Sequence, residues 1–293
     1  MLYSKIQVST TSRSMNFNGE LYDSHPAFPE ISSRAMLYGD GLFESIRMFE
    51  GKLPFLHLHW ERLLTGMNML GFQTPAHWNL AFFEQEIKKT TIGNARIRFV
   101  VWRSPGGLYF PQDNQPNFLI TATPLESNVF SWHENGLIIR LSERVRLPLD
   151  SFSGLKTLGA TRYVVAAQEA RAKGSDDVIV LNALGNVSEA SGSNLLWIKN
   201  RSVFAPSATD GQVTGTFQKI LYEVLRREGL SIVEKPSTFA ELMDADEVML
   251  TNAISGIRWV RILEGKEFTC ENIYHFNKLT VNYLIEKLAV DKP

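Results

Sequence analysis

Apolar and polar residues alternate over several short stretches in the first half of the chain, which predicts β-strands that each bury one face. Between them, apolar residues recur at helical spacing from Leu58 to Leu70, where Gly71 ends the pattern. A second helix is expected from Asn79 to Lys89. The predicted strands are 42–49, which leads into a Glu50-Gly51 hairpin, then 95–102 and 117–123.

The stretch from Pro124 to Gly136 is polar and has no clear period, so a domain boundary is expected there. We predict one unit over residues 1–125, a linker over 126–136 and a second unit over 137–293. The second unit again mixes strands and helices, which indicates α/β or α+β architecture in two domains. Its predicted elements are strands at 137–141, 178–181 and 247–251 and a helix after Thr214-Gly215 with an apolar stripe.

Size and charge narrow the possible functions. A chain of 293 residues with 44% hydrophobic content can bury the cores of two domains. Its 30 Lys and Arg nearly balance its 31 Asp and Glu. Nucleic-acid and membrane-surface binding both favour basic patches, so neither is expected, and a small-molecule partner is the better hypothesis.

The cysteine content and the N-terminus suggest where the protein resides. Cys270 is the only cysteine, which excludes an intramolecular disulfide and cannot by itself hold a zinc cluster. The N-terminus lacks an apolar core of signal-peptide length, and no apolar run approaches the roughly 18 residues that span a bilayer. We therefore expect a soluble, cytoplasmic protein.

The segment from Lys156 to Glu189 is the most informative part of the sequence. Lys156 stands in the apolar run Leu-Lys-Thr-Leu and is expected to open a helix that ends near residues 172–174. Glu189 stands 33 residues later, after a strand and a turn at 184–186. A desolvated lysine amine can attack an aldehyde, and a carboxylate can keep a pyridine nitrogen protonated. This pair is what pyridoxal phosphate chemistry requires.

Residues 156–194 resemble the cofactor segment of the class IV aminotransferases, in the Leu-Lys-Thr-Leu run and in Ser-Gly-Ser-Asn-Leu after Glu189. This fold-type IV group contains branched-chain aminotransferases, D-amino-acid aminotransferases and 4-amino-4-deoxychorismate lyases. The similarity extends from Ser33-Arg34 to about Val260. It implies a small N-terminal α/β domain, a larger C-terminal pseudo-barrel domain, pyridoxal 5′-phosphate between them, and a homodimer.

The resemblance also implies roles for individual residues around the cofactor. Lys156 would carry the cofactor, and Glu189 would meet its pyridine nitrogen. The amides of Thr216 and Phe217, at a helix N-terminus, would bind its phosphate. Phe217 and Gln218 replace the usual Thr-Arg pair, so a side-chain hydroxyl is missing there. Further phosphate contacts are expected from Asn252, Ala253 and Arg62, the last in a His-x-x-Arg-Leu motif.

Arg98 is the main candidate for binding a substrate carboxylate. Strand alternation places Arg96 and Arg98 on one face, and relatives carry a cationic residue at the position of Arg98. Tyr38 and Ser45 line the corresponding wall in relatives, and Arg34 lies in a motif that reaches across a dimer interface.

Each of these residues also has an ordinary structural interpretation. Most lysines are solvated, Glu189 and Arg62 could be exposed residues, Thr216 could begin an ordinary helix, and Arg98 could belong to a structural salt bridge. Asn194 and Ser193 are expected to shape a turn. His57 and His59 are read as polar histidines, because no acidic motif supports a metal site. The glycine turns at 38–41 and 104–107 lack the remaining residues of nucleotide-binding motifs.

The leading functional hypothesis is an aminotransferase that moves an amino group between an amino acid and a 2-oxo acid. The alternative is aminodeoxychorismate lyase, favoured by Ser45 and by Thr251-Asn252-Ala253 but opposed by Leu108, where an arginine would hold a second carboxylate. A catalytically silent PLP-binding protein is a third possibility, against which Lys156 and Glu189 argue. The sequence leaves the substrate and its stereochemistry open.

Overall fold

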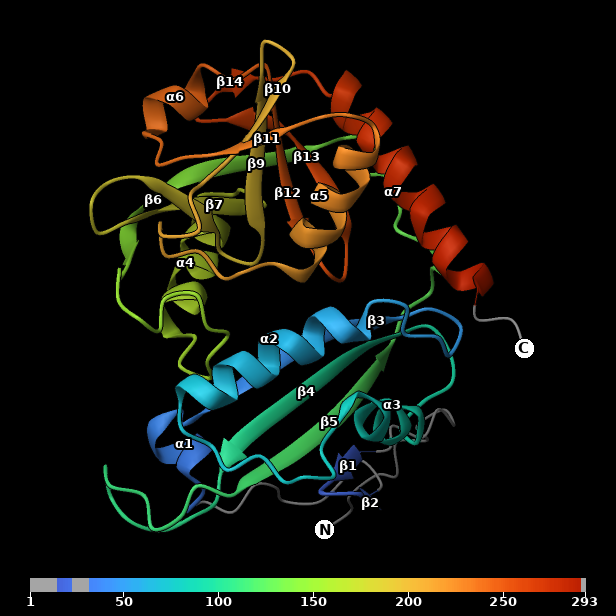
Figure 1. The fold of residues 1–293 in the computed structure, drawn as a ribbon. Helices are drawn as coiled ribbons and strands as arrows, with labels where there is room; N and C mark the ends of the chain where they lie inside the picture. Colours follow the sequence, from blue (N-terminus) through green and yellow to red (C-terminus); the bar gives the residue numbers. More distant parts are fainter. Residues whose placement is uncertain (1–14, 23–31, 291–293) are drawn as a thin grey trace, which may run out of the picture.

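The computed structural model describes residues 15–22 and 32–290, which build two β-sheets (Figure 1). Five strands form the smaller sheet in the order β2-β1-β5-β4-β3, with all neighbours antiparallel. The bounds are β1 Met15–Phe17, β2 Glu20–Tyr22, β3 Gly41–Met48, β4 Ala95–Arg103 and β5 Pro116–Pro124. The predicted strands at 42–49, 95–102 and 117–123 are therefore confirmed.

Two helices, α2 (Leu56–Met69) and α3 (Leu80–Lys88), pack on one face of this sheet. Successive side chains of a strand point to opposite faces, so Leu42 and Ile46 of β3 enter this core. Phe43 and Ser45 of the same strand face the second sheet and line a cavity there. A short helix, α1 (Arg34–Tyr38), precedes β3.

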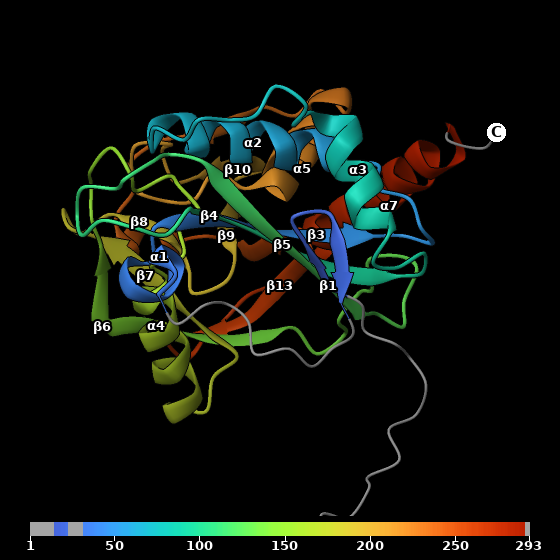
Figure 2. The same cartoon turned by 90° about the horizontal axis from the view of Figure 1, so that it is seen from below.

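Nine strands form the larger sheet, which curls into a half-barrel (Figures 1 and 2). Their order is β11-β10-β9-β12-β13-β6-β7-β8, with β14 paired to β13. Parallel pairs β13–β6, β6–β7 and β10–β11 are mixed with antiparallel ones. The bounds are β6 Leu137–Leu147, β7 Asp177–Asn182, β8 Val187–Ala190, β9 Asn194–Lys199, β10 Ser202–Ala205, β11 Ile232–Glu234, β12 Glu247–Asn252, β13 Gly256–Leu263 and β14 Lys266–Glu267.

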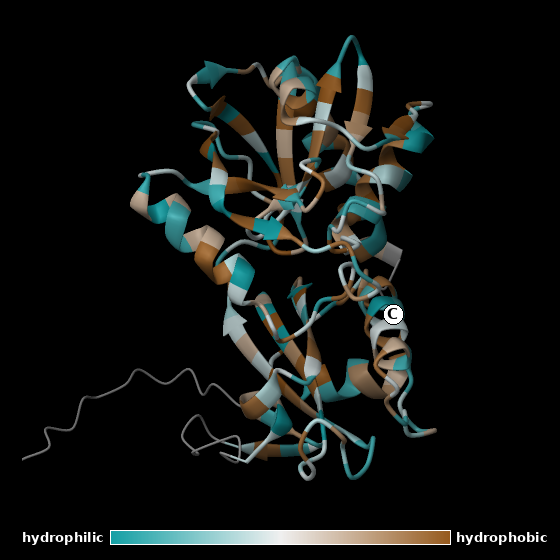
Figure 3. Ribbon diagram, turned by 90° about the vertical axis from the view of Figure 1, so that its left-hand side faces the viewer, coloured by the Kyte–Doolittle hydropathy of each residue, from teal (hydrophilic) through white to brown (hydrophobic). Residues whose placement is uncertain are grey.

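Helices cover the larger sheet on its outside. Helices α5 (Thr216–Arg227) and α7 (Glu271–Val290) pack together against β12, while α4 (Thr161–Ala172) packs on β6 and β7. A short helix, α6 (Phe239–Met243), precedes β12. Hydrophobic residues concentrate along the strands of this sheet (Figure 3). Within the described ranges, no helix combines the length and apolar character that a membrane crossing requires.

The helix expected to open at Lys156 begins five residues later, so that prediction is wrong at its start. Residues 156–158 instead pair with β3 of the smaller sheet. The Phe43 N–H donates to the Lys156 carbonyl at 2.9 Å, and the Leu158 N–H donates to the Gly41 carbonyl at 3.0 Å. Backbone groups used in this pairing cannot also form the first turn of a helix. The end of α4 at Ala172 agrees with the sequence.

One arginine joins the smaller sheet to the segment between the two sheets and to a turn of the larger unit. Arg47 of β3 donates to the carbonyls of Ser127 and Val129, at 3.0 and 2.8 Å, and to that of Ile254. Its guanidinium also lies 5.1 Å from the rings of Phe49 and Phe130. Burial lowers the pKa of Arg47. Its hydrogen bonds therefore connect β3 to residues 127–129 and to the turn that follows β12.

Replacing Arg47 with Met is expected to lower the free energy of unfolding by about 2–4 kcal/mol, because three carbonyl groups lose a charged donor. Urea denaturation measures this change. The matched control is Arg140→Met, which removes a half-exposed arginine with one ion pair to Glu264 at 3.5 Å. Equal, small losses in both variants would show that Arg47 does not hold the two parts together.

Candidate active site

A cavity of about 430 Å³ lies between the open face of the smaller sheet and the edge of the half-barrel. Phe43, Ser45, Arg96 and Arg98 line it from the smaller sheet. The larger unit contributes residues from several segments, which are 155–157, 160, 163, 189–194, 213, 215–217, 251–255 and 258. Segments distant in the sequence therefore meet in one polar cavity.

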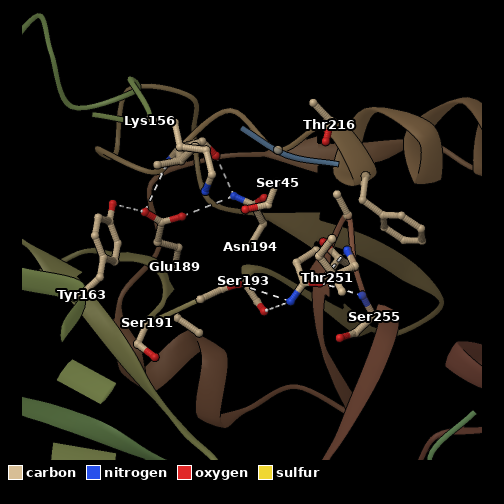
Figure 4. Close-up of a pocket in the computed structure, with 18 of the residues that line it drawn as sticks. Ser45, Lys156, Tyr163, Glu189, Ser191, Ser193, Asn194, Thr216, Thr251 and Ser255 are labelled. Atoms are coloured by element: carbon tan, nitrogen blue, oxygen red, sulfur yellow. Dashed lines mark hydrogen bonds between the residues drawn. The ribbon is translucent and has the colours of Figure 1, made fainter. Parts of the chain in front are cut away.

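Lys156 points into this cavity toward Glu189 (Figure 4). Its Nζ lies 4.6 Å from the centroid of the Phe43 ring. Burial, with the nearby positive charge of Arg62, lowers the pKa of Lys156 to about 8. A substantial fraction of this amine is consequently neutral near physiological pH, the form that can attack an aldehyde or accept a proton.

Glu189 is 4% exposed, at the end of β8. Its carboxylate accepts hydrogen bonds from the Tyr163 hydroxyl at 2.7 Å, the Val213 N–H at 3.2 Å and Asn194 Nδ2 at 3.5 Å. Burial outweighs these bonds and raises the pKa of Glu189 to about 7. A cation beside this carboxylate, such as a protonated pyridine nitrogen, would favour its ionised form.

The first turn of α5 faces the cavity without a side-chain cap. Its N-cap is Gly215, in agreement with the helix expected after Thr214-Gly215, and this residue provides no side-chain hydrogen bond to the free amides. A Cβ at Gly215 would lie 1.9 Å from Asn194 Oδ1, so only glycine fits. The amides of Thr216 and Phe217 are thus placed to bind an anion. The Phe217 side chain instead packs against Phe130, with ring centroids 5.0 Å apart.

Arg62 lies beside this helix start. Its Nη1 donates to the Thr214 carbonyl at 2.6 Å, and its Nε and Nη2 donate to Glu44 at 2.7 and 2.5 Å. Burial alone would raise the pKa of Glu44, but Arg62 and His59 outweigh it and hold that pKa at about 2. The guanidinium is therefore held in place by an ionised carboxylate, next to the uncapped amides.

His59 lies between Glu44 and Thr216 and contacts both. It is buried, and its Nδ1 lies 2.7 Å from Glu44 Oε2, while its Nε2 lies 3.4 Å from Thr216 Oγ1. Burial lowers the pKa of His59 despite the nearby carboxylate. A neutral ring that donates from Nδ1 fits both contacts. From the sequence, His59 was described only as a polar histidine, although its spacing from Arg62 was noted.

The turn after β12 forms another wall of the cavity. Asn252 Oδ1 accepts from the N–H groups of Ile254 and Ser255 at 3.0 and 2.8 Å, and its Nδ2 donates to Ser193 Oγ at 3.0 Å. The Asn252 side chain is therefore occupied with the turn, and both Asn252 and Ala253 line the cavity. Arg258 also donates to Ser193, at 2.8 Å.

Arg98 and Ser45 line the wall opposite, and Arg96 lines the cavity on the same face of its strand as Arg98. The Arg98 guanidinium carbon lies 3.4 Å from the Phe43 ring centroid, and its Nη1 lies 3.5 Å from Ser45 Oγ. Burial and the neighbouring Arg96 lower the pKa of Arg98 to about 10. Arg98 stays protonated at neutral pH and has no carboxylate partner among residues 15–22 and 32–290.

Arg34 and Tyr38 lie outside the lining of this cavity. Arg34 is buried, binds Asp40 at 2.7 Å and donates to the carbonyls of Gly106 and Leu108. Tyr38 lies 5.6 Å from Tyr109. Within one chain they support a loop, so their substrate role remains a prediction that requires a second copy.

Several site residues were missed or misread from the sequence. Tyr163 stands seven positions after Lys156 in a helix and gave no motif signal. Glu44 shares a face of its strand with apolar residues that enter the core. A buried ion pair between Glu44 and Arg62 was therefore not expected there. Asn194 was read as a turn residue, yet its side chain joins Glu189 to the Val213 carbonyl.

These residues fit pyridoxal phosphate. Lys156 offers an amine, Glu189 a buried carboxylate, and the start of α5 with Arg62 an anion cradle. The family model for amino-transferase class IV matches residues 41–263. The chain belongs to the class IV aminotransferase family. It is thereby an enzyme of a group that uses this cofactor.

Relatives of this class IV aminotransferase carry two different activities. An aminodeoxychorismate lyase of Vibrio harveyi is 27% identical over 81% of this chain and 88% of its own. A branched-chain-amino-acid aminotransferase of Pseudomonas aeruginosa is 25% identical over 86% of this chain and 85% of its own. The branched-chain aminotransferase of Thermoproteus uzoniensis, solved with norvaline, has a TM-score of 0.83, is 24% identical, and covers 96% of this chain and 96% of its own. The last of these establishes the likeness in fold.

The raised pKa of Glu189 predicts a pH dependence of stability in the cofactor-free protein. The carboxyl has a pKa of about 7 in the folded protein and about 4.5 in the unfolded chain, so its contribution to the free energy of unfolding is fully present below pH 4.5. That contribution is lost as the pH rises through 7. The loss specific to Glu189 is expected to be about 3 kcal/mol. Denaturation at pH 4.5 and 8 should show that Glu189→Gln removes this part of the fall, and parallel curves for both proteins would contradict it.

Proposed function

We propose that this enzyme is a pyridoxal phosphate-dependent aminotransferase. In this proposal Lys156 acts at the aldehyde end of the cofactor and Glu189 at its pyridine nitrogen. The observation that supports it most is the convergence of both side chains, with perturbed pKa values, in one cavity (Figure 4). Perturbed titratable groups facing one cleft are typical of catalytic sites. A silent binding protein would not require this pairing.

When bound, pyridoxal phosphate supplies an aldehyde that condenses with amines and a ring that withdraws electrons from the substrate Cα. The uncapped amides of Thr216 and Phe217, with Arg62, bind and orient its phosphate. Glu189 holds a proton at the pyridine nitrogen, and Tyr163 and Asn194 keep that carboxylate in position. These contacts fix the reacting carbon relative to Lys156.

With the cofactor bound, Lys156 would serve as the base that takes the proton from the substrate Cα and delivers it to the carbon of the cofactor's aldehyde group, after which water would release the oxo acid. Its pKa of about 8 lies near physiological pH, which suits a group that must both accept and give a proton. Arg98, on the wall beside Phe43, binds the substrate carboxylate and so orients Cα toward Lys156.

The lyase alternative rests on Ser45, whose hydroxyl lies beside Arg98 in the cavity. The opposing feature, Leu108, lies on an exposed loop outside the lining of this cavity, so it does not decide the question within one chain.

A stoichiometric assay separates the two reactions. With an amino acid and no acceptor, an aminotransferase releases one oxo acid per active site and then stops. A lyase instead releases pyruvate continuously from aminodeoxychorismate.

Replacing Lys156 with Ala should abolish covalent attachment of the cofactor and lower kcat by several orders of magnitude, because no other lysine in the described part of the chain lines the cavity. The absorbance spectrum of the holoenzyme and single-turnover kinetics measure both effects. Lys219→Ala, on the exposed side of α5, is the matched control. Wild-type turnover in Lys156→Ala would disprove this role.

We also propose a homodimer, supported by an exposed apolar loop. Leu108, Tyr109 and Phe110 are 76%, 90% and 87% exposed, although Arg34 braces their loop from within. Clustered, exposed apolar side chains of this kind mark interaction surfaces. The proposed substrate roles of Arg34 and Tyr38, on the adjoining α1, depend on this interface.

Light scattering should therefore give twice the 33.1 kDa of one chain. Phe110→Asp should shift the equilibrium toward the monomer. Ile92→Asp is the matched control, because Ile92 is an isolated apolar residue that is 82% exposed. A wild-type enzyme that is monomeric and fully active at assay concentration would refute the dimer.

A further inference from the structure

Thr251, near the end of β12, carries a buried hydroxyl that lacks a partner in the described part of the chain (Figure 4). The residue is 0% exposed, and its Oγ1 forms no hydrogen bond with any group in residues 15–22 and 32–290. It nevertheless lines the cavity, next to Asn252 and Ala253. Buried hydroxyl groups are normally hydrogen-bonded, because an unpaired one costs free energy. An acceptor that enters the cavity would satisfy it.

Alternation along β12 directs this hydroxyl toward helix α5. Met249, two residues before Thr251, packs in one core with Phe217 and Leu221 of α5. Leu250, between them, belongs to a different core on the opposite face of the sheet. Side chains two residues apart on a strand share a face, so Thr251 lies on the α5 side of the sheet.

The residue opposite Thr251 shows how close it lies to the start of that helix. Asn194 on β9 is its cross-strand partner, and directly opposite residues of an antiparallel pair have Cβ atoms about 5 Å apart. Asn194 reaches the helix start, because a Cβ at Gly215, the N-cap of α5, would lie 1.9 Å from its Oδ1. Its Nδ2 already donates to the Val213 carbonyl at 2.7 Å. Thr251 therefore lies beside the first turn of α5 with a donor that no described residue uses.

A phosphate at the start of α5 could accept a further hydrogen bond. The groups assigned to it so far are the amides of Thr216 and Phe217 and the guanidinium of Arg62. Phe217 has no hydroxyl, and the hydroxyl of Thr216 lies 3.4 Å from His59 Nε2. A phosphate group presents three strongly accepting oxygens. A hydroxyl beside this turn would therefore find an acceptor.

We propose that the Thr251 hydroxyl donates a hydrogen bond to the phosphate of bound pyridoxal phosphate and so supplies, from β12, the hydroxyl that Phe217 lacks. This inference rests on the proposed assignment of the phosphate to the start of α5. The bond ties the phosphate to the strand as well as to the helix, which restricts turning of the cofactor about its phosphate. Thr251 is a cofactor-binding residue and takes no part in proton transfer.

Titration of the cofactor-free protein with pyridoxal phosphate and with pyridoxal tests this, because the two probes differ only in the phosphate. Absorbance of the bound cofactor measures each affinity. Thr251→Val removes the hydroxyl at nearly constant volume. It should weaken pyridoxal phosphate roughly 10- to 100-fold, the scale of one hydrogen bond to a charged group, and leave pyridoxal unchanged. Thr251→Ser should retain most of the affinity, and Thr251→Ala should show the same phosphate-specific loss as Thr251→Val.

The matched control is Ser188→Ala. Ser188 of β8 is also 0% exposed, and its Oγ has no hydrogen-bond partner within the described ranges, but it does not line the cavity. Both affinities should keep their wild-type values in this variant. Urea denaturation of each variant checks that the fold is retained.

Equal weakening of pyridoxal phosphate and pyridoxal by Thr251→Val, or no weakening of either, overturns the proposal. Neither result would touch the proposed function if the wild-type enzyme transaminates an amino acid. If instead the phosphate-specific loss is found but no amino acid is transaminated, the proposed function fails while the Thr251 contact stands.

Discussion

The position of Lys156 depends on backbone pairing between residues 156–158 and β3. Two hydrogen bonds, to the carbonyl of Lys156 and from the N–H of Leu158, hold a segment of the larger unit on a strand of the smaller sheet. The pairing is close enough that a Cβ at Gly41 would lie 2.8 Å from Leu158 Cδ1. The two parts of the chain must therefore meet before the amine can face the cavity.

Burial then sets the electrostatics of the site. It lowers the pKa of Lys156 and raises that of Glu189, so both groups move toward neutrality. Glu44 is also buried, yet it stays ionised because Arg62 and His59 surround it. Glu44 thus stays charged and holds Arg62 in place. Glu189 is close to neutral and would ionise when a cation binds beside it. These different environments support structural and chemical roles for the two acids.

Local patterns predicted the elements that carry the site, because the spacing of apolar residues and the residues that end helices and strands are local features of the sequence. Strands β3, β4 and β5 and helices α2 and α3 lie where alternation and helical spacing placed them. The start of α4 was wrong because a tertiary contact with β3 competes with helix formation, and no local signal reports that contact. The predicted boundary at 126–136 lies between the last strand of one sheet and the first of the other.

Sequence patterns and the resemblance together indicated Lys156, Glu189, Arg62 and the start of α5, all of which the fold brings to one cavity. Partners that depend on three-dimensional packing were not predictable, since Tyr163 and Glu44 lie far in sequence from the groups they bind. Alternation did place Arg96 and Arg98 on one face. Only the structure shows that both lack a carboxylate partner within residues 15–22 and 32–290.

Attachment of the cofactor to the amine of Lys156 is the central claim. Reducing the holoenzyme with sodium borohydride makes the carbon–nitrogen link permanent, and peptide mapping by mass spectrometry then locates the label. We predict a single labelled peptide that contains Lys156, with the label lost when pyridoxal phosphate is omitted. A label on any other lysine, or no label on a protein that is active with the cofactor, would contradict this claim.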